Sequence, residues 1–131
     1  MRRRLVVVGL VLGVLCSCKN IAEQQIIGSW QAIEVMEKDS ILSLPLQEVT
    51  IRFSEAKQYE FKSTLNYKEA GYYQIQHNLI YLEDTTRSDT PKKAIKLAYL
   101  TYDTLLIEMQ AADNKRVMKL IKNHKDSLIN Q

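Results

Sequence analysis

The fold is decided by residues 70–83, which read Ala70-Gly-Tyr-Tyr-Gln-Ile-Gln-His-Asn-Leu-Ile-Tyr-Leu-Glu83. In the first half of this segment, Tyr73 and Ile75 alternate with neighbours of the opposite face, which is the period of a β-strand. Two turn-forming residues, His77 and Asn78, follow, and then comes a short run that is apolar on both faces. The segment therefore predicts an antiparallel β-hairpin.

The same alternation continues on both sides of this hairpin, interrupted by turn residues at short intervals. It predicts eight strands over residues 28–37, 47–53, 58–63, 70–76, 79–83, 93–100, 104–110 and 115–122. Many short strands at regular spacing are typical of an all-β sandwich or barrel.

The predicted connections alternate between long and short along the chain. They span residues 38–46, 54–57, 64–69, 77–78, 84–92, 101–103 and 111–114. In an up-and-down meander, alternate connections lie at the same end, and closing eight strands removes both sheet edges. We therefore expect an eight-stranded antiparallel up-and-down barrel with one open and one tight end, although an open meander or a two-sheet sandwich would share the alternation.

The inward faces of these strands are rich in aromatic and branched residues. We expect the following to face the interior and to be the ligand-binding candidates: Trp30, Ile51, Phe53, Tyr59, Phe61, Tyr73, Ile75, Leu97, Tyr99, Leu105 and Ile107. Such side chains either fill a small barrel or line a pocket for an apolar ligand. The apolar loop 38–46 is expected to close the open end as a lid, or to contact a ligand or partner.

The first eighteen residues have the composition of a secretory signal peptide. Arg2, Arg3 and Arg4 precede an apolar run over residues 5–15, and Leu15-Cys-Ser-Cys18 follows. The run is shorter than the roughly 20 residues that a membrane-spanning helix needs. The alternatives are an uncleaved membrane helix and ordinary cleavage without a lipid.

The Leu-x-Ser-Cys ending resembles the lipobox of bacterial lipoproteins. The resemblance implies cleavage before Cys18 and acylation of Cys18 as the new N-terminus; Cys16 fits less well because Leu15, not a small residue, precedes it. The acyl chains would hold the protein on a membrane. Lys19 is not the aspartate that can retain lipoproteins in the inner membrane, so the resemblance implies the outer membrane, on its periplasmic or surface face.

These observations divide the chain into four parts. Residues 1–17 are the expected signal peptide, residues 18–25 the lipidated cysteine and a tether, residues 26–123 the barrel, and residues 124–131 a C-terminal tail. Because the tether enters the first strand at the tight end, we expect the open end to face away from the membrane.

Charge and cysteine content exclude several functions. The chain has 18 Lys and Arg against 15 Asp and Glu, but three of the arginines belong to the signal peptide, which leaves 18 − 3 = 15 against 15. The positive charge is therefore no argument for nucleic acid. Both cysteines lie in the lipobox, so the domain is expected to have no disulfide and no thiol nucleophile.

Catalytic and metal-binding patterns are also missing from the sequence. The two histidines, His77 and His124, have no spacing that suggests a metal site or a catalytic pair, and four glycines leave no phosphate-binding loop. We expect no enzyme, no metal and no cofactor.

Gly28-Ser-Trp30 at the start of the first strand is a Gly-x-Trp motif. Together with Thr50-Ile-Arg-Phe53, Gly71-Tyr-Tyr-Gln-Ile75 and Asn78-Leu-Ile-Tyr-Leu82, it resembles bacterial lipocalin-like lipoprotein domains over residues 26–123. The resemblance implies that Trp30 lies inside the tight end, covered by an arginine from a late strand. The sequence departs from this pattern, because Arg116, the one late-strand arginine, is expected at the open end.

Two functional hypotheses follow. The first is a lipid-anchored, non-enzymatic barrel of the cell envelope that binds a small apolar or amphipathic molecule. The second is an envelope interaction protein with a filled barrel, which docks a protein partner through its loops or outer face. Neither involves nucleic acid, and both involve a membrane through the acyl chains.

Overall fold

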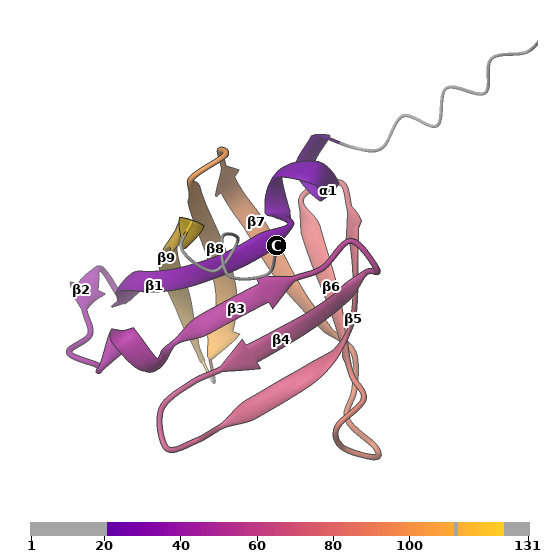
Figure 1. Ribbon diagram of the computed structural model, residues 1–131. Coiled ribbons are helices and arrows are strands. Elements are labelled where there is room, and N and C mark those ends of the chain that lie inside the picture. Colours follow the sequence, from indigo (N-terminus) through magenta and orange to yellow (C-terminus); the bar gives the residue numbers. More distant parts are fainter. Residues whose placement is uncertain (1–20, 112, 125–131) are drawn as a thin grey trace, which may run out of the picture.

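The structure is a computed structural model that describes residues 21–111 and 113–124 (Figure 1). The expected signal peptide, Cys18 and the tail beyond His124 lie outside the described residues. Within the described part of the chain, no helix has the length and apolar character needed to cross a membrane.

The described chain contains one short α-helix, one 3-10 helix and nine strands. Their bounds are α1 Ile21–Ile26, β1 Gly28–Glu37, β2 Ser40–Ile41, η1 Leu46–Glu48, β3 Thr50–Phe53, β4 Gln58–Lys62, β5 Lys68–Gln76, β6 Leu79–Asp84, β7 Lys93–Leu100, β8 Thr104–Ala111 and β9 Asn114–Lys122. The eight predicted strands are all present. The strand predicted over 47–53 is shorter, because η1 takes up its first residues.

Eight of the strands close into a barrel. Each strand from β3 to β9 pairs antiparallel with its neighbour in sequence, and β1 pairs antiparallel with both β3 and β9. The two-residue β2 pairs only with the end of β1, so that the β1–β2 hairpin projects beyond the barrel wall (Figure 1). The predicted eight-stranded antiparallel up-and-down barrel is confirmed.

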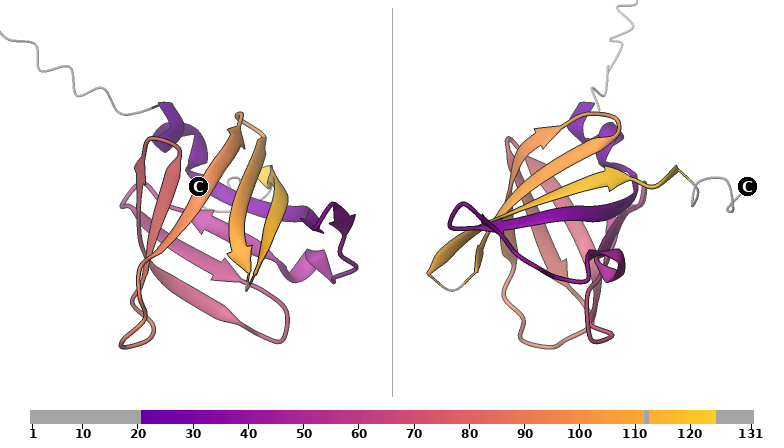
Figure 2. Two further views of the ribbon diagram at one scale, coloured as in Figure 1. Left: turned by 180° about the vertical axis from the view of Figure 1, so that it is seen from behind. Right: turned by 90° about the vertical axis from the view of Figure 1, so that its left-hand side faces the viewer.

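The two ends of the barrel are built differently. The short β3–β4, β5–β6 and β7–β8 connections lie at the end that carries α1, and the longer β4–β5 and β6–β7 loops lie at the other end (Figures 1 and 2). The helix α1 occupies most of the segment 18–25 that was expected to be a tether. Its last residue, Ile26, is completely buried, and burial of this apolar side chain holds the helix on the barrel end.

The interior is one continuous apolar core, made by the inward residues of all eight barrel strands. Its fully buried large side chains are Trp30, Ile26, Ile80, Leu105, Leu120 and Val35. Inward residues face each other across neighbouring strands, as Ile51 faces Phe61 and Tyr73 faces Leu82. The period-two pattern of the sequence is therefore the pattern of burial.

Tyr99 is the exception among the residues expected to face inward. Between β7 and β8, Leu97 faces Ile107 but Tyr99 faces Leu106, because Ala98 is inserted as a β-bulge. One extra residue shifts the alternation, so that everything after it points to the opposite side. Tyr99 is consequently 52% exposed on the outer face, and Leu100 packs against the core instead. The prediction for Tyr99 was wrong.

Candidate ligand-binding site

The end of the barrel that carries α1 is closed around Trp30. Its indole is completely buried, and Nε1 donates a hydrogen bond of 2.8 Å to the carbonyl oxygen of Ile26 at the end of the helix. The tryptophan thus joins α1 to the barrel interior, because its only polar group is satisfied by the helix backbone.

A lysine, not an arginine, covers Trp30. Lys122 lies directly opposite Trp30 in the β1–β9 register, and its Nζ sits 5.3 Å from the ring centroid and 3.3 Å from the carbonyl oxygen of Gln25. Burial lowers the pKa of the Lys122 ammonium. Arg116 lies at the opposite end, as the strand order predicted, and pairs there with Glu37 at 3.3 Å. Lys122 therefore supplies the cation that the resemblance assigned to an arginine.

This arrangement explains the glycine of the Gly-x-Trp motif. Gly28 has φ of +136°, which side-chain-bearing residues rarely adopt, and a Cβ placed there would lie 2.7 Å from Cε of Lys122. A larger residue would disturb both the strand entry and the lysine that covers the tryptophan.

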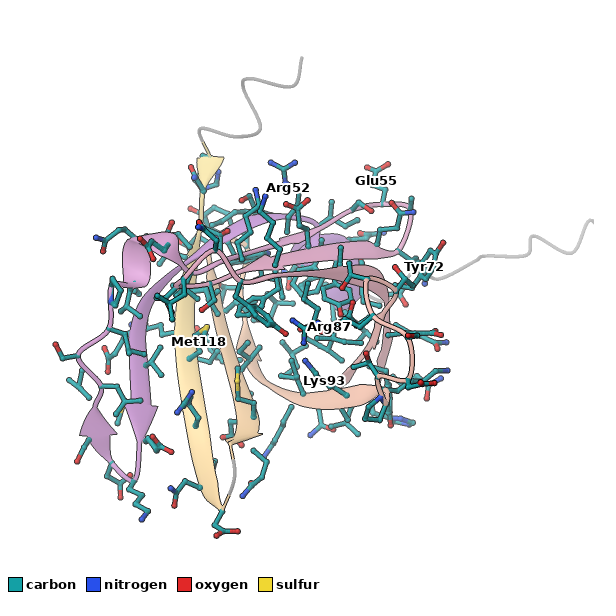
Figure 3. All side chains as sticks on the ribbon, turned by 90° about the horizontal axis from the view of Figure 1, so that it is seen from below. Arg52, Glu55, Tyr72, Arg87, Lys93 and Met118 are labelled. Atoms are coloured by element: carbon teal, nitrogen blue, oxygen red, sulfur yellow. The ribbon has the colours of Figure 1, made fainter. Side chains whose placement is uncertain are left out.

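A cavity of about 430 Å³ lies in the interior toward the other end. Most of its wall is apolar, and Met118 can be seen in it from that end (Figure 3). The lining residues are Ile51, Tyr59, Phe61, Glu69, Leu82, Lys93, Ala94, Ile95, Ile107, Met109, Gln110 and Met118. The barrel is therefore packed at one end and hollow at the other.

An ion pair is built into the cavity wall. Glu69, whose side chain is 4% exposed, accepts hydrogen bonds at both oxygens from Nζ of Lys93, at 3.0 and 2.9 Å. The hydroxyls of Tyr59 and Tyr67 donate to the same carboxylate at 2.7 and 3.1 Å. Every lone-pair direction of the buried carboxylate thus has a donor, which is the condition under which a buried charge is tolerated. Burial, together with the hydrogen bond to Glu69, raises the pKa of Tyr59 well above its ordinary value.

A second carboxylate and a second cation stand near this pair. Asp84 is buried and accepts from the backbone and hydroxyl of Thr86 through Oδ1. The hydrogen bond from the Thr86 hydroxyl is the main reason why the pKa of Asp84 is lowered, and the charges of Arg87 and Lys93 act in the same direction. Arg87 stacks with its guanidinium 4.8 Å from the ring centroid of Tyr67. Polar groups of both signs therefore gather at the open end.

Four of the eleven predicted ligand-binding residues line the cavity: Ile51, Tyr59, Phe61 and Ile107. Six others belong to the packed core or pack against it: Trp30, Phe53, Tyr73, Ile75, Leu97 and Leu105. Tyr99 lies outside the barrel. The predicted set is thus mostly interior, but only part of it borders free space.

Glu69, Lys93, Met109 and Met118 line the cavity but are not in the predicted ligand-binding set. Lys93 begins the predicted strand 93–100 and has the same parity as the inward residue Ile95. Glu69 lay in the predicted connection 64–69, and it has the same parity as Tyr73 and Ile75 once that strand is extended to include it. A charged residue at an inward position was the available signal, because such residues are rarely buried without a partner.

The apolar loop 38–46 contributes no residue to the cavity wall. Leu42 and Leu46 pack against the core, and the side-chain amide Nε2 of Gln31 donates to the carbonyl oxygen of Leu46 at 2.6 Å. Ile41 and Leu44 are exposed. The expected lid therefore finds no support. Among the described residues, no cluster of three or more His, Cys, Asp or Glu side chains is arranged to hold a metal ion.

Comparison with known proteins identifies the architecture. A lipocalin-like protein from Bacteroides uniformis ATCC 8492, known from its crystal structure, superposes with a TM-score of 0.54 over 72% of this chain and 97% of that protein, at 16% sequence identity. The fold is lipocalin-like. No family model and no curated protein sequence matches the chain. The lipocalin-like fold expected from the Gly-x-Trp motif is thus confirmed by structure, with very little sequence identity to support it.

Proposed function

We propose that this protein is a lipid-anchored, small-ligand-binding protein of the cell envelope, which holds an apolar or amphipathic molecule in the open end of its barrel. The observation that carries the proposal is the cavity of about 430 Å³ with its largely apolar wall. Pockets of roughly 300–1,000 Å³ with apolar walls and a few polar groups are the usual form of small-molecule sites.

The chemistry of the wall favours binding over catalysis. The cavity wall includes the apolar side chains of Ile51, Ile107, Met109 and Met118. A hydrophobic ligand that displaces water from these side chains would be stabilised by the hydrophobic effect. The buried carboxylate Glu69 is engaged by Lys93 and two tyrosines, and neither described histidine, His77 or His124, lines the cavity. We therefore also propose that the protein is not an enzyme.

The anchor and its direction are part of the proposal. The described chain begins with α1 at the closed end, three residues after Cys18, the proposed site of acylation. A lipid on Cys18 would place the closed end nearest the membrane and leave the cavity mouth accessible from the aqueous side. We propose the outer membrane as its location, because Lys19 is not the aspartate that can retain lipoproteins in the inner membrane.

A second function retains support from the outer surface. Ile41 is 70% exposed and Leu44 is 44% exposed in the loop 38–46, and together they could meet a protein partner in the envelope. The cavity makes ligand binding the better-supported function, because a filled barrel was the condition for the alternative.

Native mass spectrometry tests ligand binding. The chain from residue 19 onward, purified gently from its own host, is expected to carry an adduct that organic extraction removes. A clean mass before extraction, with no mass shift when dodecanol or dodecanoate is added, would reject the proposed function and leave docking through the loop 38–46.

Metabolic labelling with an alkyne-tagged fatty acid tests the anchor. Cys18→Ser should abolish labelling and release the protein from membranes, whereas the matched variant Cys16→Ser should remain labelled. Equal labelling of the C18S variant and the unaltered protein would contradict acylation at Cys18.

A further inference from the structure

We propose that the molecule held in the cavity is an anionic amphiphile, with its apolar chain among the cavity walls and its carboxylate or phosphate head bound by Lys93 and Arg87 at the mouth. The inference rests on the proposed function and specifies the ligand of the same cavity.

Lys93 is the first donor available to such a head. It lies opposite the inward residue Leu82 at the start of β7, and its ammonium is fixed by the two oxygens of Glu69 at 3.0 and 2.9 Å. An ammonium group has three N–H donors, so one remains after these two bonds. The side chain is 47% exposed, which keeps that donor within reach of a molecule entering the mouth.

Arg87 supplies the second set of donors. Lys93 lines the cavity and Arg87 does not, but seen from the open end the two side chains lie near each other at the mouth (Figure 3). The guanidinium of Arg87 stacks on Tyr67, which in turn donates to Glu69, so the arginine belongs to the same cluster. In the part of the chain that the structure describes, no carboxylate pairs with Arg87. A planar fork of five N–H donors is suited to a carboxylate or phosphate.

The carboxylates do not offer a comparable site for a cationic head. Both oxygens of Glu69 already accept two hydrogen bonds each, from Lys93 and from Tyr59 or Tyr67. Asp84 Oδ2 has no hydrogen-bond partner, but it is buried out of contact with solvent, whereas Arg87 is exposed.

The excess of donors at the mouth therefore selects the charge of the ligand. The formal charges of Lys93 and Arg87 are balanced by Glu69 and Asp84, so a net field cannot make the choice. Free N–H groups can, because a charge-assisted hydrogen bond forms only where a donor has room for a new acceptor. The cavity offers such donors at its rim and no free carboxylate oxygen in its wall.

Calorimetry with ligands that differ only in their head group tests this inference. We would titrate the chain from residue 19 onward, which contains the whole barrel, with dodecanoate, dodecyl phosphate, dodecanol and dodecyltrimethylammonium. Dodecanoate or dodecyl phosphate is expected to bind about tenfold or more tightly than dodecanol. A stronger response to dodecanoate would point to free fatty acids, and a stronger response to dodecyl phosphate would point to lipid phosphates; both support the inference.

Two variants locate the head group. Arg87→Gln is expected to weaken binding of the better anion about tenfold and to leave dodecanol binding unchanged, whereas Lys92→Gln, on the neighbouring exposed lysine, should change neither. The double variant Glu69→Gln with Lys93→Gln removes the ammonium without stranding a buried carboxylate, and it should lower the anion's advantage in the same way.

The experiments distinguish failure of the proposed function from failure of the inference about the head group. If none of the four amphiphiles binds, the proposed function fails. If dodecanol or the ammonium compound binds as tightly as the anions, or if R87Q and the double variant both leave anion binding unchanged, ligand binding stands and the anionic head group is rejected.

Discussion

The two ends of this barrel are built from the same strands but differ in how their interiors are packed. At the closed end, Trp30, Ile26 and Lys122 fill the interior and tie α1 to the first and last strands. At the open end, Met109 and Met118 border free space, and an ion pair stands in the wall. The comparison teaches that dense packing is concentrated around the tryptophan, while the same strands leave a cavity at the other end.

The largest expected effect comes from removing the tryptophan. Trp30→Ala should lower the free energy of unfolding by about 3–5 kcal/mol, since it opens a large cavity and strands the Ile26 carbonyl. Met109→Ala at the open end should lower it by only about 1 kcal/mol, because that side chain is partly exposed and already borders a cavity. Urea denaturation followed by circular dichroism measures both, and equal losses would break the comparison.

A smaller effect is expected at the ion pair. Lys93→Gln should lower the free energy of unfolding by about 1–2 kcal/mol, less than for a fully buried pair because the ammonium is half-exposed. Lys92→Gln is the matched control and should change it by less than about 0.5 kcal/mol. The double variant of Glu69→Gln and Lys93→Gln should recover most of the loss. If the double variant has a lower free energy of unfolding than K93Q, the buried carboxylate of Glu69 does not need this lysine as its partner.

The bulge in β7 gives a further, local test. Leu97→Ala should lower the free energy of unfolding by about 1–2 kcal/mol, because Leu97 packs against the core, whereas Tyr99→Ala should change it by less than about 0.5 kcal/mol. Thermal unfolding of the two variants compares the two sides of the strand. A Tyr99→Ala variant as destabilised as Leu97→Ala would argue that Tyr99 faces inward.

The smallest expected effect is a loss of stability at alkaline pH, which is absent at neutral pH and depends on two tyrosines. Burial raises the pKa of Tyr59 and of Tyr73 above the ordinary value. Below the pKa of an unfolded tyrosine, the raised pKa values do not change the free energy of unfolding. Above that pKa, the unfolded chain gives up protons that the folded chain retains, so the free energy of unfolding falls as the pH rises. Absorbance titration should show Tyr59 and Tyr73 ionising only with unfolding, and replacing either with Phe should reduce the alkaline loss of stability. Normal titration of all tyrosines in the folded state would contradict their burial.

Much of the fold could be predicted from alternation alone. Every predicted strand exists, and the alternation of long and short loops correctly indicated which end is open, because strand parity and connectivity are local properties of the chain. The bulge at Ala98 could not be predicted, since an inserted residue leaves no mark in composition, and Tyr99 was therefore placed on the wrong face. The helix α1 was missed because six residues carry too weak a periodicity.

The site was less predictable than the fold. Inward parity found Ile51, Tyr59, Phe61 and Ile107, but parity cannot distinguish a packed interior from a hollow one. That difference depends on side chains from all eight strands meeting in space. The pairing of Glu69 with Lys93 joins β5 and β7, and the Trp30–Lys122 contact joins the first and last strands of the barrel. In neither pair does the sequence around one residue indicate which residue is its partner.

Nuclear magnetic resonance of the methionine methyl groups and the single indole tests the central claim most directly. Met109 and Met118 line the cavity, Met36 lies outside the cavity wall, and Trp30 marks the closed end. On titration with dodecanoate and with dodecanol, the methyl signals of Met109 and Met118 should shift, while those of Met36 and the Trp30 indole remain in place. Shifts centred on Trp30 or Met36, or no shift at saturating concentrations of both compounds, would contradict a barrel that is closed at the tryptophan and binds ligand at the opposite end.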